Sequence, residues 1–413
     1  MEIKESKKFL YVVGAFPPSI GMGGIRALEF SKRLVKKGIF PIFLTRKSHK
    51  KELISKKFFS KIPSSVIVYR SNYFRLANRY IREFLNLFFR IDFYLDWIPF
   101  AYLKGKKILK KHKDIRFIYT TGLPISSFII GYLLKLKFKI PLVVEYRDPW
   151  SFNPFLMKNQ LLLNQKIDLI LEKRWLSSAD VIITVSPKLT QFLKKNFLFI
   201  GNIPIYSIPN GLNLNAEKLD AKKKDKKNEI VFTFTGKLYG GRNITPLFKI
   251  ISELKKEGYF DDLRFKLKIF GAYKKIMEKQ VKQLNISDIV LLGGFITRSD
   301  VFNELYKCDL PIHIGENLNY PTLAFKVFDY LSIGKKMLYL GREDSYTAKY
   351  LKENNFGITI PINNFKEGKK KFKNLLNDIK NQVFEYSVKR EEILKLSWDN
   401  RARDLMEVIS THF

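Results

Sequence analysis

Short apolar runs alternate with longer amphipathic stretches along nearly the whole chain. The first run, Phe9 to Val13, is continuously apolar, as strands buried in parallel sheets are. A stretch with helical spacing, Ile25 to Lys37, follows it, and further apolar runs stand within 140–150, at 181–185 and at 230–236. This alternation of strand and helix patterns predicts an α/β protein built on parallel sheets.

The pattern also divides the chain. A charged, Lys-rich stretch, Glu217 to Asn228, interrupts the alternation, and the order strand, glycine loop, helix begins again after it. At 413 residues the chain exceeds what one ordinary core holds. We predict an N-terminal domain at 1–205, a C-terminal domain at 206–395, and a last helix at 396–413 whose apolar side needs a partner outside the helix.

The amino-acid composition excludes several classes of protein. An apolar share of 46% excludes a mainly disordered chain. The single cysteine, Cys308, excludes an internal disulfide and a cysteine-cluster metal site. The four histidines have no paired spacing, so we expect no zinc site.

The net charge of +36 predicts attraction to a polyanion: nucleic acid, an anionic membrane or a phosphorylated substrate. The alternative is a genome composition that enriches Lys without selection for binding. The segment Tyr73 to Lys113 favours an anionic membrane surface because basic and aromatic residues interleave in it. Its members include Arg75, Arg79, Arg82, Phe84, Leu85, Phe88, Phe89, Lys104, Lys106, Lys107, Lys110, Lys111 and Lys113. A pair of helices that cover the sheet with solvated lysines is the other interpretation.

The first sixteen residues indicate a strand without a cleavage-like site, so we expect no signal peptide. The run Phe117 to Leu134 approaches the length of a membrane span, but Gly122 and Pro124 interrupt it. It predicts a buried strand, a turn and a helix. We therefore expect a cytoplasmic protein, either soluble or attached to the cytoplasmic face of the membrane.

The stretch Pro321 to Leu340 carries the sharpest chemical signal. Its apolar residues fall near helical spacing, while Lys326 and Asp329 share another face. A loop that enters a helix offers backbone N–H groups to a phosphate, Lys326 adds positive charge, and Asp329 can accept hydrogen bonds from a ribose diol. The alternative is an ordinary core helix with a surface Lys/Asp pair.

Three further places have residues suited to ligands. Gly23 and Gly24 follow the first strand, although their spacing is not the dinucleotide fingerprint. Gly236, Lys237 and Arg242 follow the strand that opens the second half, where glycines flanked by cations suit a pyrophosphate. Arg147 and Asp148 follow Glu145 at the end of an apolar strand, where ligands of open α/β sheets bind, unless the two pair with each other as structural ions.

Taken together, the chain resembles a glycosyltransferase of the GT-B architecture, similar to the retaining family 4. The resemblance covers nearly the whole chain in order. It is carried by stretches such as FPPSIGMGGIRALEFSKRL, TTGLPISSFIIG, VVEYRDPW, SADVIITVSPKLTQFL, IPNGLNLN, TFTGKLYGGRNITPL, LGGF, CDLPIHIG and AFKVFDYLSIGKK. It implies two facing Rossmann-like domains with a central cleft, and a C-terminal helix that crosses back to the first domain.

The resemblance also implies residue roles. In the donor site, Lys237 and Arg242 neutralise the diphosphate beside Gly236 and Lys326, while Asp329 holds the ribose where the family usually has Glu. Gly294 and Phe295 lie where the base is recognised through backbone contacts. Gly23 and Gly24 contact the diphosphate or the sugar, and Asp148 with Arg147 faces the acceptor. Pro321 stands where family members often have a second acid, for which Glu316 is a candidate substitute.

The implied activity is retaining, metal-independent transfer of a sugar from a UDP- or GDP-sugar to a hydroxyl of a glycan or lipid-linked acceptor, in cell-surface polysaccharide synthesis. The nucleotide sugar is a co-substrate, and no bound cofactor or nucleic acid is expected. No enzyme nucleophile stands out, which favours front-face attack. The alternatives are a nucleotide-sugar epimerase of the same architecture, which needs catalytic acids and a histidine, and a non-catalytic protein that binds membrane or nucleic acid by charge.

Overall fold

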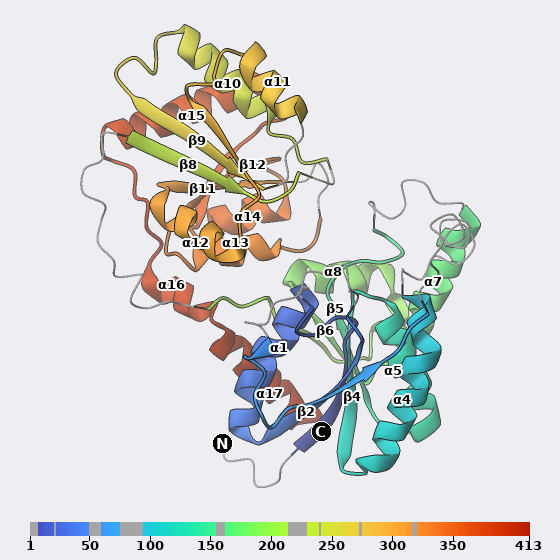
Figure 1. The fold of residues 1–413 in the computed structure, drawn as a ribbon. Helices are drawn as coiled ribbons and strands as arrows, with labels where there is room; N and C mark the ends of the chain where they lie inside the picture. Colours follow the sequence, from blue (N-terminus) through green and yellow to red (C-terminus); the bar gives the residue numbers. More distant parts are fainter. Residues whose placement is uncertain are drawn as a thin grey trace. The chain divides into compact units, whose positions relative to one another are not determined.

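A computed structural model describes residues 7–19, 22–48, 59–74, 94–153, 162–213, 229–238, 241–271, 275–315 and 320–413. The chain forms two compact units (Figure 1). The first consists of Met1–Gly211 together with Trp398–Phe413, and the second of Leu212–Ser397.

The first unit contains a seven-stranded sheet in the order β3-β2-β1-β4-β5-β6-β7, and every neighbouring pair is parallel. The strands are β1 Lys7–Val12, β2 Ile39–Arg46, β3 Ile67–Ser71, β4 Ile115–Thr121, β5 Leu142–Tyr146, β6 Val181–Thr184 and β7 Ile205–Ser207. The chain reverses its direction of travel across the sheet between β1 and β4. Ligands of open α/β sheets bind beside such a point, at the carboxyl ends of the strands.

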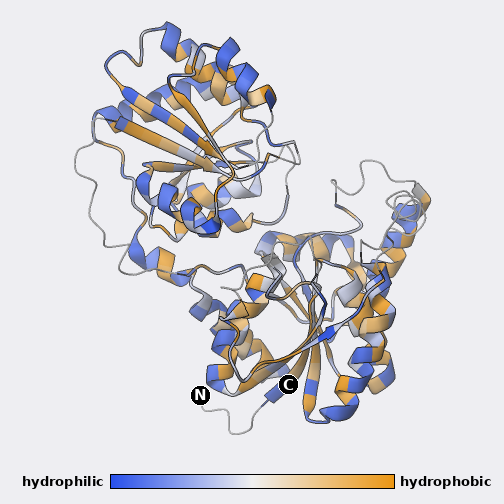
Figure 2. Ribbon diagram, in the orientation of Figure 1, coloured by the Kyte–Doolittle hydropathy of each residue, from blue (hydrophilic) through white to orange (hydrophobic). Residues whose placement is uncertain are grey.

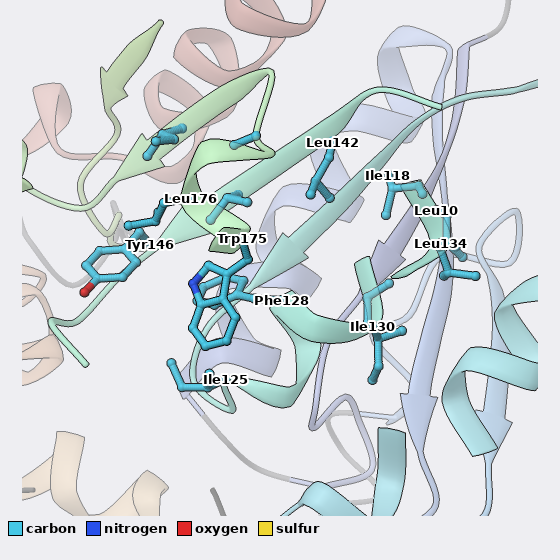
Figure 3. Close-up of a cluster of buried hydrophobic side chains, with 14 of the residues drawn as sticks. Leu10, Ile118, Ile125, Phe128, Ile130, Leu134, Leu142, Tyr146, Trp175 and Leu176 are labelled. Carbon is cyan, nitrogen blue, oxygen red and sulfur yellow. The ribbon is translucent and has the colours of Figure 1, made fainter. Parts of the chain in front are cut away.

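Helices cover both faces of this sheet (Figure 1). They are α1 Met22–Leu34, α4 Ile98–Lys111, α5 Ser126–Phe138, α7 Leu162–Ser177, α8 Pro187–Asn196 and α17 Trp398–His412, with short 3-10 turns η1 Val35–Lys37, η2 Leu95–Trp97 and η3 Leu198–Ile200. On one face, the strand residues Leu10, Ile118 and Leu142 belong to one core cluster with Phe128 of α5 and Trp175 of α7 (Figure 3). Alternate residues of the same strands point to the opposite face, where α1 and α17 pack together.

The second unit repeats the plan with six parallel strands in the order β10-β9-β8-β11-β12-β13. The strands are β8 Glu229–Thr235, β9 Arg264–Phe270, β10 Val290–Gly294, β11 Leu310–Ile314, β12 Met337–Leu340 and β13 Gly357–Ile360. The helices are α10 Thr245–Lys256, α11 Lys275–Gln283, α12 Arg298–Lys307, α13 Phe325–Leu331, α14 Tyr346–Glu353, α15 Phe365–Lys380 and α16 Arg390–Lys395. Hydrophobic residues predominate along the strands of both units, whereas the helices alternate hydrophobic and hydrophilic residues (Figure 2). The α/β class with parallel sheets is therefore confirmed.

The unit boundaries differ from the predicted domain limits at 205 and 395. Strand β7 extends to Ser207 and completes the first sheet, so the first unit continues to Gly211. The last helix belongs to the first unit because Trp398 packs edge-on against Phe30 of α1, with 5.5 Å between the ring centroids. Arg33 of α1 also pairs with Asp399 of α17 at 2.9 Å.

One sequence interpretation needs correction, and a second falls partly outside the described residues. Helix α1 begins at Met22, so Gly23 and Gly24 lie in its first turn and not in a loop before it. In the basic and aromatic segment, residues 75–93 lie outside the described residues. Its lysine cluster is on α4, which packs against α5 and β2 as a covering helix of the sheet.

Candidate active site

The turn after β8 is built around Gly236. Its φ of +128° lies in the region that favours glycine, and a Cβ atom there would lie 1.8 Å from Nζ of Lys326. The Gly236 N–H donates to the Phe270 carbonyl at 2.7 Å, and the Gly271 N–H donates to the Gly294 carbonyl at 2.6 Å. The ends of β8, β9 and β10 therefore meet backbone to backbone at the carboxyl edge of the sheet.

Lys326 of α13 reaches this turn. Its Nζ donates to the Thr235 carbonyl at 2.6 Å and lies 5.2 Å from the centroid of the Phe234 ring. Burial and the nearby Arg242 guanidinium lower the pKa of Lys326 to about 8, against the opposing effect of the Asp329 carboxylate. An ammonium group has three donors, so Lys326 can bind an anion while it keeps its bond to Thr235.

Tyr330, one turn further along α13, fixes the same strand end. Its hydroxyl shares a hydrogen bond with the Thr235 hydroxyl at 3.1 Å and donates to the Thr235 carbonyl at 3.4 Å. Burial raises the pKa of Tyr330 well above its usual range, so the phenol stays neutral. The sequence suggested an anion site at the start of this helix, but α13 is only seven residues long, which makes its end a weak site. The anion site is therefore assigned to these side chains and to the Gly236 turn.

Asp329 is held by a partner that sequence reasoning missed. Its Oδ1 accepts a hydrogen bond from Nη2 of Arg298 at 2.7 Å, and Arg298 is the first residue of α12. Burial raises the pKa of Asp329 even though the Arg298 guanidinium opposes that shift. The alternative of a surface Lys326/Asp329 pair is wrong, because Lys326 bonds to Thr235 and Asp329 pairs with Arg298.

His313 of β11 also lies close to the cations. It is buried beside Tyr339, with 5.6 Å between ring centroids. Burial, together with Arg242 and Lys326, lowers the pKa of His313 to about 3, so the imidazole is neutral at physiological pH. No local pattern marks His313, because its neighbours come from other segments of the chain.

The remaining predicted donor residues lie around this edge. Arg242 is half-buried and close enough to influence both Lys326 and His313, whereas Lys237 is exposed. Gly294 ends β10 with a φ of +68°, and the Phe295 side chain after it is 74% exposed. Glu316 lies outside the described residues.

The first unit brings Gly23, Gly24 and Arg147 together at its own carboxyl edge. A Cβ atom on Gly23 would lie 2.7 Å from Nη2 of Arg147, and one on Gly24 would lie 2.5 Å from the Ala15 carbonyl oxygen. Gly24 is therefore required for close packing on the backbone, whereas a side chain at position 23 would displace the Arg147 guanidinium. Arg147 donates to the carbonyls of Gly122 and Leu123, and half-buried Asp148 follows it in the chain.

A buried ion pair lies next to this edge of the first sheet. Nε of Arg26 donates to Oε1 of Glu145 at 2.8 Å, and Glu145 also accepts from the hydroxyls of Tyr119 and Thr121. Burial disfavours the charged form of Glu145, but the Arg26 and Arg147 guanidiniums favour that form, and the net effect lowers the pKa of Glu145. Arg26 also donates to the Ile208 carbonyl at 2.7 Å, which ties α1 to the chain that leaves the unit.

Glu172 of α7 holds the loop that carries Arg147 and Asp148. Its carboxylate accepts hydrogen bonds from the Tyr146 hydroxyl and from both the hydroxyl and the N–H of Ser151. Burial raises the pKa of Glu172 despite these bonds. The loop is thus anchored on both sides of Arg147 and Asp148. Sequence reasoning missed this contact, because Glu172 is separated from the loop in the chain.

The described residues contain neither a candidate metal cluster nor a candidate membrane-spanning helix. Among those residues, no group of three His, Cys, Asp or Glu side chains is arranged to hold a metal ion. Within the same ranges, no helix has both the length and the apolar character needed to cross a bilayer.

Comparison with known proteins relates the chain to glycosyltransferases. A sequence profile of Glycosyltransferase Family 4 matches residues 23–216. An uncharacterised glycosyltransferase of Methanocaldococcus jannaschii is 25% identical over 316 residues, which span 70% of this chain and 75% of the relative. The match to the relative therefore extends beyond the part that the profile covers.

Solved structures show the same fold. A glycosyltransferase from Rickettsia africae has a TM-score of 0.65 at 15% identity, with 98% of this chain and 97% of the other covered. A sucrose-phosphate synthase from Thermosynechococcus elongatus has a TM-score of 0.68 at 15% identity, with 98% of both chains covered. At this identity the likeness concerns the fold, which is GT-B. The chain therefore has the GT-B fold, and it resembles the glycosyltransferases of family 4.

Proposed function

We propose that the protein is a retaining, metal-independent glycosyltransferase that moves a sugar from a nucleoside-diphosphate sugar to an acceptor hydroxyl. The observation that carries the proposal is the group of Lys326, Arg242 and Asp329 around the Gly236 turn. UDP- and GDP-sugars are the proposed donors, and the proposed acceptor is a surface glycan or its lipid-linked precursor.

The cations of the second unit match the charge that develops during transfer. Lys326 is held at the end of β8 by its bond to Thr235, and Arg242 is near enough to lower its pKa. Lys326 is thus held in place before the reaction, and together with Arg242 it can stabilise the departing diphosphate with little reorganisation. Exposed Lys237 lies between Gly236 and Arg242 in the sequence and adds a third cation to the proposed diphosphate site.

The carboxylate of Asp329 is proposed to bind the ribose. A ribose diol donates two hydrogen bonds, and the two oxygens of an ionised carboxylate can accept both. Arg298 donates to Oδ1, which orients the side chain, and its guanidinium favours the charged form against the burial that raises the pKa of Asp329. Gly294 and Phe295, at the end of the neighbouring strand β10, are proposed to contact the base.

The first unit is proposed to bind the acceptor beside Asp148 and Arg147, with Gly23 and Gly24 near the transferred group. In the proposed front-face step, the acceptor oxygen forms a bond to the anomeric carbon on the side from which the diphosphate leaves. The bond between that carbon and the phosphate oxygen breaks, and the electron pair goes to the diphosphate. The acceptor proton passes to a diphosphate oxygen, so configuration is retained without an enzyme nucleophile.

The first experiment measures thermal stabilisation by UDP, GDP, ADP and CMP, for the wild type and for Asp329→Asn. Ligand at a hundredfold its Kd stabilises the native state by about 2.7 kcal/mol. We expect one diphosphate to raise Tm clearly in the wild type and much less in Asp329→Asn. Asp344→Asn is the matched control, because Asp344 also pairs with an arginine, Arg342, at 2.6 Å.

Two further measurements test the finer parts of the proposal. Hydrolysis or transfer from the donor that binds should give a product of unchanged anomeric configuration in NMR, and EDTA should leave the rate unchanged. If no diphosphate raises Tm, the donor assignment is wrong. An inverted product, or loss of activity in EDTA, would contradict the proposed chemistry while leaving the donor site in place.

A further inference from the structure

The outer face of α7 is unusual for a helix that faces water. Leu163, Ile167 and Ile170 follow helical spacing on one stripe and are 66%, 39% and 64% exposed. Leu169 beside them is 38% exposed. Single exposed apolar residues are ordinary, but a contiguous stripe of large ones marks an interaction surface.

The charges of α7 are divided between its two sides. Both acids, Asp168 and Glu172, are buried against the rest of the unit. The exposed charged residues are Lys166, Lys173 and Arg174. The outer face of α7 therefore combines apolar and basic side chains, and its exposed residues include no acid.

The turn η3 extends this surface. Leu198 is 83% exposed and Phe199 is 36% exposed. The Lys173 ammonium lies 5.3 Å from the centroid of the Phe199 ring, which places η3 against α7. Exposed Lys194 and Lys195 end α8 just before the turn. We call this surface, with Leu163, Lys166, Ile167, Leu169, Ile170, Lys173, Arg174, Leu198 and Phe199, the α7–η3 face.

An anionic lipid surface fits this combination better than a second copy of the chain. Large apolar side chains gain free energy by entering the acyl boundary, while Lys and Arg beside them contact anionic headgroups. Two copies of the face would instead bring the lysines of one copy against those of the other, which is unfavourable. The net charge of +36 adds a long-range attraction to the same partner.

We propose that the α7–η3 face is a peripheral membrane-binding surface for anionic bilayers. Leu163, Ile167, Ile170 and Leu198 enter the headgroup boundary, and Lys166, Lys173 and Arg174 contact lipid phosphates. This location differs from the segment 73–113 to which the sequence pattern pointed. The proposed membrane contact rests on residues of the first unit and does not depend on the donor site. Only the inference that the acceptor is lipid-linked rests on the proposed function.

The test is flotation of the full-length protein with vesicles of phosphatidylcholine alone or mixed with phosphatidylglycerol. Ile170→Glu is compared with Ile276→Glu, because Ile276 on α11 of the second unit is 61% exposed and also has neighbouring lysines. We expect the wild type to bind the anionic vesicles. Ile170→Glu should weaken that binding by about tenfold or more, since one large apolar side chain is lost from the boundary. Ile276→Glu should bind like the wild type.

Three results would overturn the proposal. The wild type could fail to bind anionic vesicles, or both variants could lose the same fraction of binding, which would mean a general charge effect. A concentration-dependent dimer that only Ile170→Glu abolishes would make the face an interface between copies. Stabilisation by a nucleoside diphosphate, measured on the same samples, shows that each variant is folded. It also distinguishes loss of nucleotide binding from loss of vesicle binding.

Discussion

Gly236 shows how one residue fixes the position of a functional cation. Its φ of +128° and the 1.8 Å between a built Cβ and Nζ of Lys326 act together. We expect Gly236→Ala to cost about 1–3 kcal/mol of stability from backbone strain and to weaken diphosphate binding, because the lysine must move. Chemical denaturation and nucleotide titration measure the two effects.

Gly38 provides the matched control for this change. It has a φ of +74°, but nothing lies within 4 Å of a Cβ atom built there. Gly38→Ala should therefore cost a similar strain energy and leave diphosphate affinity unchanged. If Gly236→Ala loses stability but binds diphosphate normally, the turn does not position Lys326 for the ligand.

Lys326 makes diphosphate binding depend on pH. Its pKa is lowered to about 8 by burial first and by Arg242 second, so the ammonium loses its proton as pH rises through that value. The charged form attracts the diphosphate; hence affinity should be constant from pH 7 to about 7.5 and fall by up to about tenfold per unit above pH 8. Calorimetric titration between pH 7 and 9.5 measures this dependence.

Lys326→Arg separates this effect from other titrations, since a guanidinium stays charged throughout the range. The variant should bind more weakly at pH 7 because its geometry differs, yet lose little further affinity up to pH 9.5. An equal fall in the variant and the wild type would assign the pH dependence to another group.

At the scale of elements, the sequence predicts what local pattern controls. The apolar runs locate β1, β6 and β8, and the glycine turns between strands and helices are placed close to where they occur. The start of α1 is the exception. Glycine is a poor helix former, so the pattern predicts a helix from Ile25, whereas close packing of Gly23 on Arg147 allows it to begin at Met22.

Contacts between distant elements could not be read from the sequence. Arg298 stands 31 positions before Asp329, and Arg26 stands 119 positions before Glu145. Both ion pairs form only because the order of the strands brings distant segments together. In a parallel sheet that order is set by pairing between strands that are far apart in the sequence. The sequence thus singled out Lys326 and Asp329 but not the residues that hold them in place. Their roles in the reaction stay predictions.

The Arg26–Glu145 pair joins α1 to β5 in the middle of the first unit. Removing one partner leaves the other charge buried, which costs about 3–5 kcal/mol. We expect Arg26→Met to destabilise the first unit by that amount, and Arg26→Met with Glu145→Leu to recover much of the loss. Chemical denaturation, with hydrogen exchange to separate the two units, gives both values. A double variant no more stable than Arg26→Met would mean that other bonds, such as that to Ile208, dominate.

At the scale of the whole molecule, the two units share one plan. Each sheet reverses direction beside its first strand, and each has a glycine-containing segment after that strand. The units differ in the charge they bring to this place. The second has two cations, Arg242 and Lys326, beside the turn, whereas the first has Arg147 there and buries its Arg26 charge against Glu145. This difference supports the proposed division into a donor unit and an acceptor unit.

Hydrogen exchange tests that division across the entire chain. A bound ligand raises the free energy of opening of the segments it contacts, by about 2.7 kcal/mol at a hundredfold its Kd. With the nucleoside diphosphate that raises Tm, we expect the strongest protection at 234–238, 294–298 and 325–331. Strand β5 of the first unit serves as the internal reference, and Asp329→Asn should lose the protection. Protection that is strongest in the first unit would place the nucleotide on the other half of the molecule and reverse the assignment of donor and acceptor.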